Sequence, residues 1–229
     1  MPEVSVVVCT RNEESNIEGC LKSLHMQKER PEIIVVDGHS TDNTVKIAKK
    51  MADKVIFDNK MGLGDARNVG AKAASGRIVA YCDADCRPLP DWTSKIAELV
   101  CGNVVAVSGP LVAIDGGLKQ KIGFRIWADI VPRILAKLGY HCLWGANMAI
   151  DRKTLLENPF KNTFIEDYEL GSRLRDIKGV RFCKELRMPA STRRFAKSFH
   201  RTCIKHYIGS ALKLKFGKAS RGYYEHMKI

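Results

Sequence analysis

Several features that mark other protein classes are missing from this 229-residue sequence. No apolar stretch reaches the roughly 18 residues that a helix needs to span a bilayer. The first residues carry no basic head and no small-residue cleavage site, so we expect no secretory signal peptide. The eight cysteines form no C-x-x-C pair, and several lie in apolar runs. We therefore expect reduced thiols in a cytoplasmic protein, with at most a peripheral contact to a membrane.

Two common nucleotide-binding motifs are absent as well. The glycine-rich fingerprint G-x-G-x-x-G does not follow the first strand-like run, and the phosphate loop G-x-x-x-x-G-K-[ST] does not occur. These absences weaken the interpretation of the chain as a dinucleotide-binding protein and as a phosphate-loop nucleotide-binding protein. Repeats and low-complexity linkers are also missing. We therefore expect one catalytic domain over residues 1–190, followed by a basic, amphipathic helical extension over residues 191–229.

The formal charge of +13 is unevenly distributed along the chain. Residues 1–171 hold 22 basic and 22 acidic side chains, whereas residues 172–229 hold 16 basic and 3 acidic ones. A localised basic segment indicates an anionic partner, such as nucleic acid, anionic lipid or a phosphorylated substrate. The charge alone does not choose among these partners.

Short runs rich in β-branched residues alternate with helical patterns in the first half of the chain. This alternation predicts an α/β fold in which helices flank a parallel sheet. The strand-like runs are 4–9, 32–36, 54–57 and 77–82, and the helical patterns are 16–24, 44–51, 66–74 and 92–100. The second half predicts a strand over 104–112, a helix over 118–138 with a kink at Pro132, a turn over 144–147 and a helix over 165–177.

Polar clusters follow three of the predicted strands. They are Thr10-Arg11-Asn12-Glu13, Asp37-Gly38-His39-Ser40 and Asp83-Ala84-Asp85. In an open α/β sheet the ligand crevice lies at the carboxyl ends of the strands, so we expect the three clusters to converge on one site.

The Asp83-Ala84-Asp85 triplet places two carboxylates at a strand end. Hard oxygen ligands of this kind suit Mg²⁺ or Mn²⁺, with coordination positions left for substrate phosphates. Such triplets also arise on ordinary turns, where aspartates cap helices, so the triplet alone is weak evidence for a metal. The motifs around it strengthen the metal interpretation.

With Gly64-Asp65-Ala66-Arg67-Asn68-Val69-Gly70 ahead of the Asp83 strand and Gly145-Ala146-Asn147-Met148 downstream, the sequence resembles the family 2 glycosyltransferases. Phe164-Ile165-Glu166-Asp167-Tyr168-Glu169-Leu170 extends the resemblance to roughly the first 200 residues. It implies a GT-A fold, in which a mixed, mainly parallel sheet is flanked by helices. It also implies an inverting, metal-dependent transfer of a sugar from a UDP- or GDP-sugar.

The resemblance assigns roles at the donor site. Thr10, Arg11, Asn12 and Glu13 would lie near the nucleoside, Asp37 would bond the base, and Arg67 would contact the base or diphosphate. Asp83 would touch the ribose and assist the metal, and Asp85 would be the main metal ligand. On chemistry alone, Asp37 could instead shape the turn before the helix at Thr44, and Arg67 could be a surface residue.

At the acceptor side, Asp167 matches the general base of the family. Direct displacement with inversion needs a base on the face opposite the leaving nucleotide. Glu166 and Glu169 are more typical of acids at a helix N-terminus, which the helix dipole favours, and the same explanation is open for Asp167.

Further downstream, Thr192-Arg193-Arg194-Phe195 resembles an arginine-rich element that follows the acidic pair in many family members. Here phenylalanine replaces the usual tryptophan and the spacing is compressed. Arg193 and Arg194 would serve the donor diphosphate, and His200 would be a third metal ligand. A histidine in a basic amphipathic segment is more often a surface residue.

Two amphipathic segments with basic flanks, 118–138 and 195–216, suggest where the acceptor binds. Either stripe could simply pack on the sheet. Near a phosphate-handling site, however, they favour a polyprenyl phosphate or a lipid-linked glycan as acceptor, with the enzyme at the inner face of the membrane.

Three competing interpretations remain at this stage. A sugar-nucleotide nucleotidyltransferase would need a glycine-rich loop after the first strand, where this chain has Thr10-Arg11-Asn12-Glu13. A nucleic-acid-binding protein would use the basic tail, but crevice carboxylates would repel a phosphate backbone. A catalytically idle scaffold is disfavoured by the presence of both acidic motifs.

Overall fold

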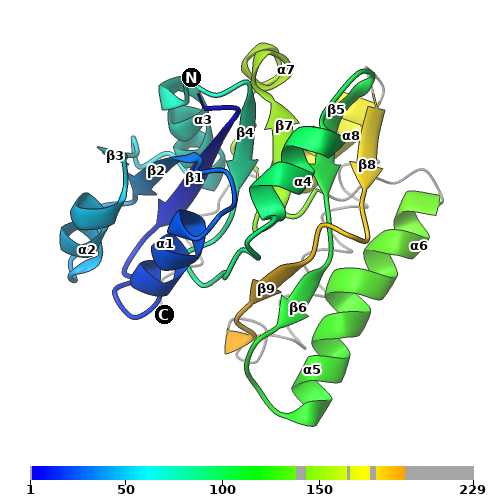
Figure 1. Cartoon of the computed structure of the whole chain (residues 1–229), viewed down its shortest axis with the longest axis horizontal. Coiled ribbons are helices and arrows are strands. Elements are labelled where there is room, and N and C mark those ends of the chain that lie inside the picture. The colour runs from blue at the N-terminus through cyan, green and yellow to red at the C-terminus, as the bar shows by residue number, and fades with distance from the viewer. Residues whose placement is uncertain (1, 138–142, 164–165, 176–178, 194–229) are drawn as a thin grey trace.

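A computed structural model describes residues 2–137, 143–163, 166–175 and 179–193 (Figure 1). Seven strands form one sheet in the order β3-β2-β1-β4-β7-β5-β8. The first four, β1 (Val4–Thr10), β2 (Glu32–Asp37), β3 (Lys54–Phe57) and β4 (Ile78–Tyr81), are parallel. β7 (Met148–Asp151) runs antiparallel to β4 and to β5 (Val104–Ser108), and β8 (Gly179–Phe182) runs parallel to β5. The sheet is therefore mixed and mainly parallel, as predicted.

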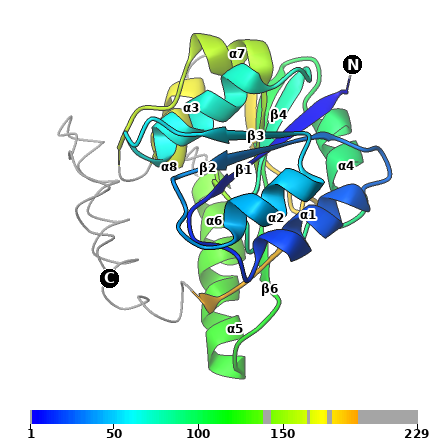
Figure 2. The ribbon, with the colours of Figure 1, turned by 90° about the vertical axis from the view of Figure 1, so that its left-hand side faces the viewer.

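Helices cover both faces of this sheet (Figure 2). One face carries α1 (Ile17–His25), α2 (Thr44–Met51) and α4 (Trp92–Leu99). The other carries α3 (Leu63–Ala73), α7 (Arg152–Glu157) and α8 (Glu166–Arg175). Side chains of a strand alternate between faces, so Val6 and Val8 join the first core while Val7 joins the second. Burial on both faces explains why these strands are apolar almost throughout.

A second layer lies beside the sheet. β6 (Leu111–Ala113) and β9 (Met188–Ala190) pair in parallel, and a long helix runs along β6 (Figure 1). This helix comprises α5 (Leu118–Arg125), a π-helical turn η1 (Ile126–Ile130) and α6 (Val131–Lys137). In place of the predicted kink at Pro132, the helix widens into the π turn just before the proline. The wider turn accommodates a residue that lacks an N–H and crowds the carbonyl four positions back.

The second half of the chain departs from the sequence prediction in its strands. The single strand expected over 104–112 is split by Gly109 and Pro110 into β5 and β6, which belong to different sheets. A side-chain carbon on Gly109 would lie 2.0 Å from the Leu186 carbonyl oxygen, so this corner needs glycine. β7, β8 and β9 were not predicted. No helix in the described ranges is both long and apolar enough to cross a membrane.

Candidate functional site

The loops after β1 and β2 are joined by hydrogen bonds at the carboxyl edge of the sheet. The Asn12 N–H donates to Ser40 Oγ at 2.8 Å, and Asn12 Oδ1 accepts from the Thr41 N–H at 2.9 Å. The Glu13 N–H donates to Thr44 Oγ1 at 2.8 Å. Asn12 has a φ of 53°, which asparagine tolerates better than most residues. The first two polar clusters thus meet, and the exposed Arg11 lies beside them.

Asp37, at the end of β2, is fully buried. Its carboxylate accepts hydrogen bonds from Thr10 Oγ1 at 3.0 Å, from the Ser40 N–H at 2.7 Å and from Ser40 Oγ at 2.6 Å. A carboxylate offers roughly four lone-pair positions, so these bonds use most of them. Asp37 therefore shapes its turn, and its contact with the nucleobase stays a prediction.

Arg193 links two acidic residues that are far apart in the sequence. Its guanidinium bonds both carboxylate oxygens of Glu13, and its Nε lies 3.3 Å from Asp85 Oδ2. Glu13 and Asp85 are both buried. β9 brings Arg193 to this position, because Ala190 bridges Cys86 and the Ser191 N–H donates to the Asp85 carbonyl oxygen at 3.1 Å.

A third acid holds the end of this segment in place. Asp115, in the loop after β6, accepts bonds from Ser191 Oγ at 2.6 Å, from the Thr192 N–H at 2.8 Å and from Thr192 Oγ1 at 2.6 Å. Although partial burial opposes it, these bonds lower the pKa of Asp115. Asp115 is a positioning residue for Arg193 that the sequence did not reveal.

The carboxylates at this edge suit a divalent cation that arrives with a phosphate ligand. In the described part of the chain, no three histidine, cysteine, aspartate or glutamate side chains are grouped to enclose a metal by themselves. Asp85 already takes a guanidinium as counter-ion, and the half-buried Asp83 lies two residues away. Two hard oxygen ligands with the remaining positions filled by diphosphate are a usual arrangement for Mg²⁺. Arg194 and His200 lie outside the described residues.

A second acidic cluster forms at the N-terminus of α8. Arg67, from α3, pairs with Glu166, and both side chains are about 5% exposed. Asp167 accepts the Gly145 N–H at 2.9 Å and the Tyr168 N–H at 2.8 Å. The Arg67 guanidinium also lies over the Phe160 ring, 5.6 Å from its centroid. Arg67 is thus buried, which excludes the surface alternative, and it pairs with the acidic cluster, while its contact with the base or diphosphate stays a prediction.

The turn at Trp144–Asn147 explains how these groups come so close. A side-chain carbon on Gly145 would lie 1.8 Å from Arg67 Nη2, so any larger residue would displace the arginine. Asn147 is fully buried, accepts from Trp92 Nε1 at 2.9 Å and donates to the Leu186 carbonyl at 2.7 Å. Gly145 therefore helps to build the acidic cluster, and Asn147 fixes the turn that carries Gly145; the sequence alone did not reveal these roles.

Burial controls the ionisation of this cluster. It raises the pKa of Glu166 to about 7, although Arg67 acts in the opposite direction. Burial likewise raises the pKa of Asp167, against the lowering effects of Arg67 and the Gly145 N–H. For Arg67, burial lowers the pKa, but Glu166 and Asp167 raise it by more, so the guanidinium stays charged. A buried carboxylate with a raised pKa is a stronger proton acceptor than an exposed one once it is ionised.

Several known proteins are similar to this chain. It is 34% identical over 118 residues to glycosyltransferase AglE of Haloferax volcanii, covering 48% of this chain and 39% of that protein. It is 33% identical over 171 residues to an uncharacterized glycosyltransferase of Nostoc, covering 69% and 53%. A dolichyl N-acetyl-alpha-D-glucosaminyl phosphate 3-beta-D-2,3-diacetamido-2,3-dideoxy-beta-D-glucuronosyltransferase of Methanococcus voltae is 27% identical, covering 73% and 55%. The chain thus spans about half or less of the length of these curated relatives.

Solved structures share the fold. Glucosyl-3-phosphoglycerate synthase of Mycobacterium tuberculosis, in complex with Mn²⁺, UDP and glucosyl-3-phosphoglycerate, superposes with a TM-score of 0.69 at 21% identity, covering 96% of this chain and 82% of that one. Mannosyltransferase PcManGT of Pyrobaculum calidifontis, in complex with GDP-Man and Mn²⁺, gives a TM-score of 0.65 at 21% identity, covering 83% and 57%. At this identity the likeness establishes the GT-A architecture alone.

The family model for glycosyl transferase family 2 matches residues 5–157, which is more than half of the chain. This match spans the three polar clusters at the sheet edge and the turn that positions Arg67. It decides between the glycosyltransferase interpretation and the alternatives of a nucleotidyltransferase or a nucleic-acid-binding protein. The chain belongs to glycosyl transferase family 2.

Proposed function

We propose that this protein transfers a sugar, with inversion, from a UDP- or GDP-sugar to a lipid-linked acceptor. The observation that carries the proposal is the meeting of the buried Glu13 and Asp85 carboxylates on one cation, Arg193, at the carboxyl edge of the sheet. In a family 2 glycosyltransferase this edge is the natural place for a nucleotide diphosphate. Solved structures of the same fold hold UDP with Mn²⁺ or GDP-Man with Mn²⁺.

In this proposal Asp83 and Asp85 hold a Mn²⁺ or Mg²⁺ ion, which would stabilise the negative charge that develops on the departing diphosphate. Arg193 contacts the same diphosphate, since a guanidinium matches phosphate oxygens in charge and geometry. Thr10, Arg11, Asn12 and Glu13 border the nucleoside. Arg194 and His200 join the diphosphate and the metal from the segment beyond the described residues.

Asp167 is the proposed general base. The acceptor hydroxyl attacks the anomeric carbon, the bond to the nucleotide breaks on the opposite side, and the hydroxyl proton passes to the Asp167 carboxylate. Arg67 keeps Glu166 paired, and the Gly145 N–H orients Asp167. A phosphate acceptor would arrive already ionised and need no base, so a base at Asp167 goes with a hydroxyl on a lipid-linked glycan rather than with a bare polyprenyl phosphate.

The lipid part of the proposal has support from one relative, whose name describes transfer onto a dolichyl-linked sugar phosphate. The basic excess of residues 172–229 fits an enzyme that works at an anionic membrane surface from the cytoplasmic side. We accordingly assign residues 1–190 to the catalytic domain and residues 191–229 to a basic extension, which starts at the site with Thr192 and Arg193 and continues to the membrane.

The direct test is transfer to a detergent-solubilised polyprenyl-phosphate glycan, with GDP-mannose and UDP-glucose as trial donors and with Mn²⁺, Mg²⁺ or chelator. We expect a metal-dependent product whose new linkage is β when the donor is α, as read by proton NMR of the anomeric signal. A product of retained configuration, or equal transfer in chelator, would refute the proposed mechanism.

A further inference from the structure

The outward side of the long helix carries a row of apolar residues at every fourth position. These side chains are between 41% and 75% exposed, and we call them the apolar ridge: Leu118, Ile122, Ile126, Ile130 and Ile134. In a regular α-helix a four-residue repeat drifts around the axis by about 40° per step. The wider π turn at Ile126–Ile130 offsets part of this drift and keeps the ridge on one side. Five exposed aliphatic side chains in a row need a partner surface.

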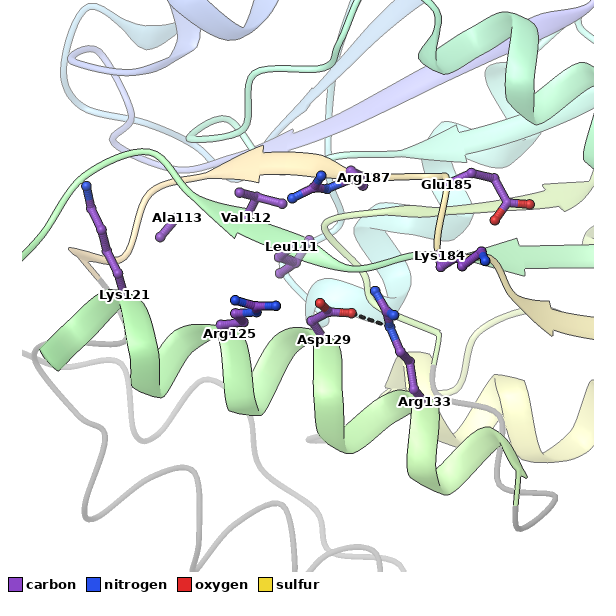
Figure 3. Close-up of a pocket in the computed structure, with 10 residues that line it drawn as sticks. All are labelled: Leu111, Val112, Ala113, Lys121, Arg125, Asp129, Arg133, Lys184, Glu185 and Arg187. Carbon is purple, nitrogen blue, oxygen red and sulfur yellow. Dashed lines mark ion pairs between the residues drawn. The ribbon is translucent and has the colours of Figure 1, made fainter. Parts of the chain in front are cut away.

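A basic cavity lies next to the ridge, between the helix and the β8–β9 connection (Figure 3). Its volume is about 650 Å³, and β6 forms its apolar floor. From the helix, Lys121, Arg125 and Arg133 point into it, and Lys184 and Arg187 line the opposite wall (Figure 3). The acids on its lining are Asp129 and Glu185. Asp129 is paired with Arg133 at 2.5 Å, so the cations remain in excess.

The basic cavity opens toward a more apolar groove along α6. This groove, about 840 Å³ in volume, shares Arg133, Lys184 and Glu185 with the cavity, so the two adjoin. Ile130, Ile134, Ala136, Val180 and Phe182 form most of its apolar lining. A basic end next to an apolar channel is complementary to an amphiphile with an anionic head.

We propose that the long helix lies on an anionic lipid surface, with a lipid phosphate in the basic cavity, its hydrocarbon chain in the groove along α6, and the apolar ridge in the membrane interface. Cations that border an exposed apolar stripe are the usual composition of such interfacial helices. The site deepens the proposed membrane contact and rests on it, but it does not depend on the donor crevice.

Charge favours lipid over a second copy of the chain. A second copy would bring the same row of cations against this one, which is unfavourable near an interface of low dielectric constant. An anionic bilayer instead offers both a counter-charge at the depth of Lys121 and Arg125 and an apolar layer for the isoleucines.

Vesicle co-sedimentation of the full chain tests the site. The vesicles are phosphatidylcholine alone or mixed with phosphatidylglycerol, at low and high salt. We expect binding to the mixed vesicles, and a loss on the order of 100-fold for Lys121→Gln/Arg125→Gln/Lys184→Gln. The variant Ile122→Ser/Ile126→Ser/Ile130→Ser should lose the part of the binding that resists salt.

A matched control removes three exposed cations from α2 as Lys46→Gln/Lys49→Gln/Lys50→Gln. α2 contacts β3, at the opposite edge of the sheet from β8, which α6 contacts. It should bind the mixed vesicles as the parent does. Parental binding by the cavity and ridge variants would overturn the site and move the membrane contact to another surface, such as residues 194–229. Absence of parental binding to the mixed vesicles at low salt would overturn it outright.

A second experiment measures the binding of inorganic phosphate to the parent and to the same variants. If phosphate binds with the same dependence on Lys121, Arg125 and Lys184 but the vesicles do not bind, the cavity serves a free phosphate ligand and the lipid assignment fails. Melting temperatures with and without a nucleotide sugar are measured on every variant. An unchanged donor response separates failure of the lipid site from failure of the proposed transfer reaction.

Discussion

At the residue scale, the adjacent carboxylates Glu166 and Asp167 have different hydrogen-bond partners, because only Glu166 bonds the buried Arg67. Arg67 pairs with Glu166, while Asp167 is held by backbone N–H groups. The neighbours therefore have different partners, since Glu166 pairs with a permanent cation, whereas Asp167, the proposed base, accepts backbone N–H groups. Breaking a buried ion pair leaves a charge without compensation, which is costly.

Asp167→Asn should bind donor as the parent does and lose transfer to a hydroxyl acceptor by about 100-fold or more, because an amide keeps the shape but accepts no proton. Donor titration and initial rates measure the two effects. Glu157→Gln, an exposed change on α7, is the control and should leave both unaltered. Parental rates in Asp167→Asn would place the base elsewhere.

The raised pKa of Glu166 predicts a pH-dependent stability. Glu166 ionises near pH 4.5 in the unfolded chain and near pH 7 in the fold, so between these values the folded state keeps a proton that the unfolded state has lost. The free energy of unfolding should therefore fall as pH rises across this window.

Glu166→Gln removes that titration, and it also leaves Arg67 without its carboxylate at every pH. Denaturant unfolding at several pH values should show the parent losing stability relative to the variant from pH 5 to pH 8. The other titratable groups facing this pair are Asp167, Cys9 and Asp83, and they are common to both proteins. A difference that stays constant with pH would contradict the raised pKa.

In the proposed metal site, Arg193 would compete with the divalent cation for Asp85. Its side chain is 39% exposed, so solvent screens the pair. Arg193→Gln should raise the Mn²⁺ affinity measured without donor by at most about fivefold, and it should lower the affinity for the nucleotide diphosphate. Calorimetry with each ligand measures both, with Arg181→Gln on β8 as control. Weaker Mn²⁺ binding without donor would show that Arg193 does not occupy a metal position.

At the element scale, the sequence predicted some parts of the fold much better than others. The strands and helices up to Leu99 were predicted closely, because each strand is a continuous apolar run and each helix has its own apolar face. The later strands are three to five residues long, and β9 contains a proline. Such short segments contain too few residues to show the hydrophobic periodicity of a strand. They become strands because they pair with other strands in the fold.

β9 matters because it carries Thr192 and Arg193 to the site, and Asp115 holds its end. Asp115→Ala should lower donor affinity several-fold by releasing Arg193, since it removes three hydrogen bonds to Ser191 and Thr192. Fluorescence titration with a nucleotide sugar measures the loss. Glu98→Ala, exposed on α4, is the matched control. Unchanged donor affinity in Asp115→Ala would mean that Arg193 reaches the diphosphate without this support.

At the scale of the whole molecule, the expectation that a ligand site lies at the carboxyl ends of the strands predicted which segments meet. It did not predict what each side chain contacts. Thr10, Asn12, Glu13, Asp37 and Asp85 all lie at the expected sheet edge. The pairing of Arg67 with Glu166 was not predictable, because it depends on the close approach that Gly145 permits between segments about 80 residues apart. The basic cavity was likewise not predictable from the sequence, because only the tertiary fold places Lys184 and Arg187 opposite the helix.

The central claim is that this edge of the sheet binds a nucleotide sugar through a metal on Asp85. Thermal unfolding of the parent and of Asp85→Ala, with UDP- and GDP-sugars and with or without Mn²⁺, tests it most directly. A ligand at 100 times its Kd stabilises the fold by about 2.7 kcal/mol, a shift of a few degrees at this chain length. We predict that a sugar nucleotide raises the parental melting temperature when Mn²⁺ is present and has little effect on Asp85→Ala, which should melt near the parent without ligand. The same shift in both proteins, or in chelator, would contradict the account.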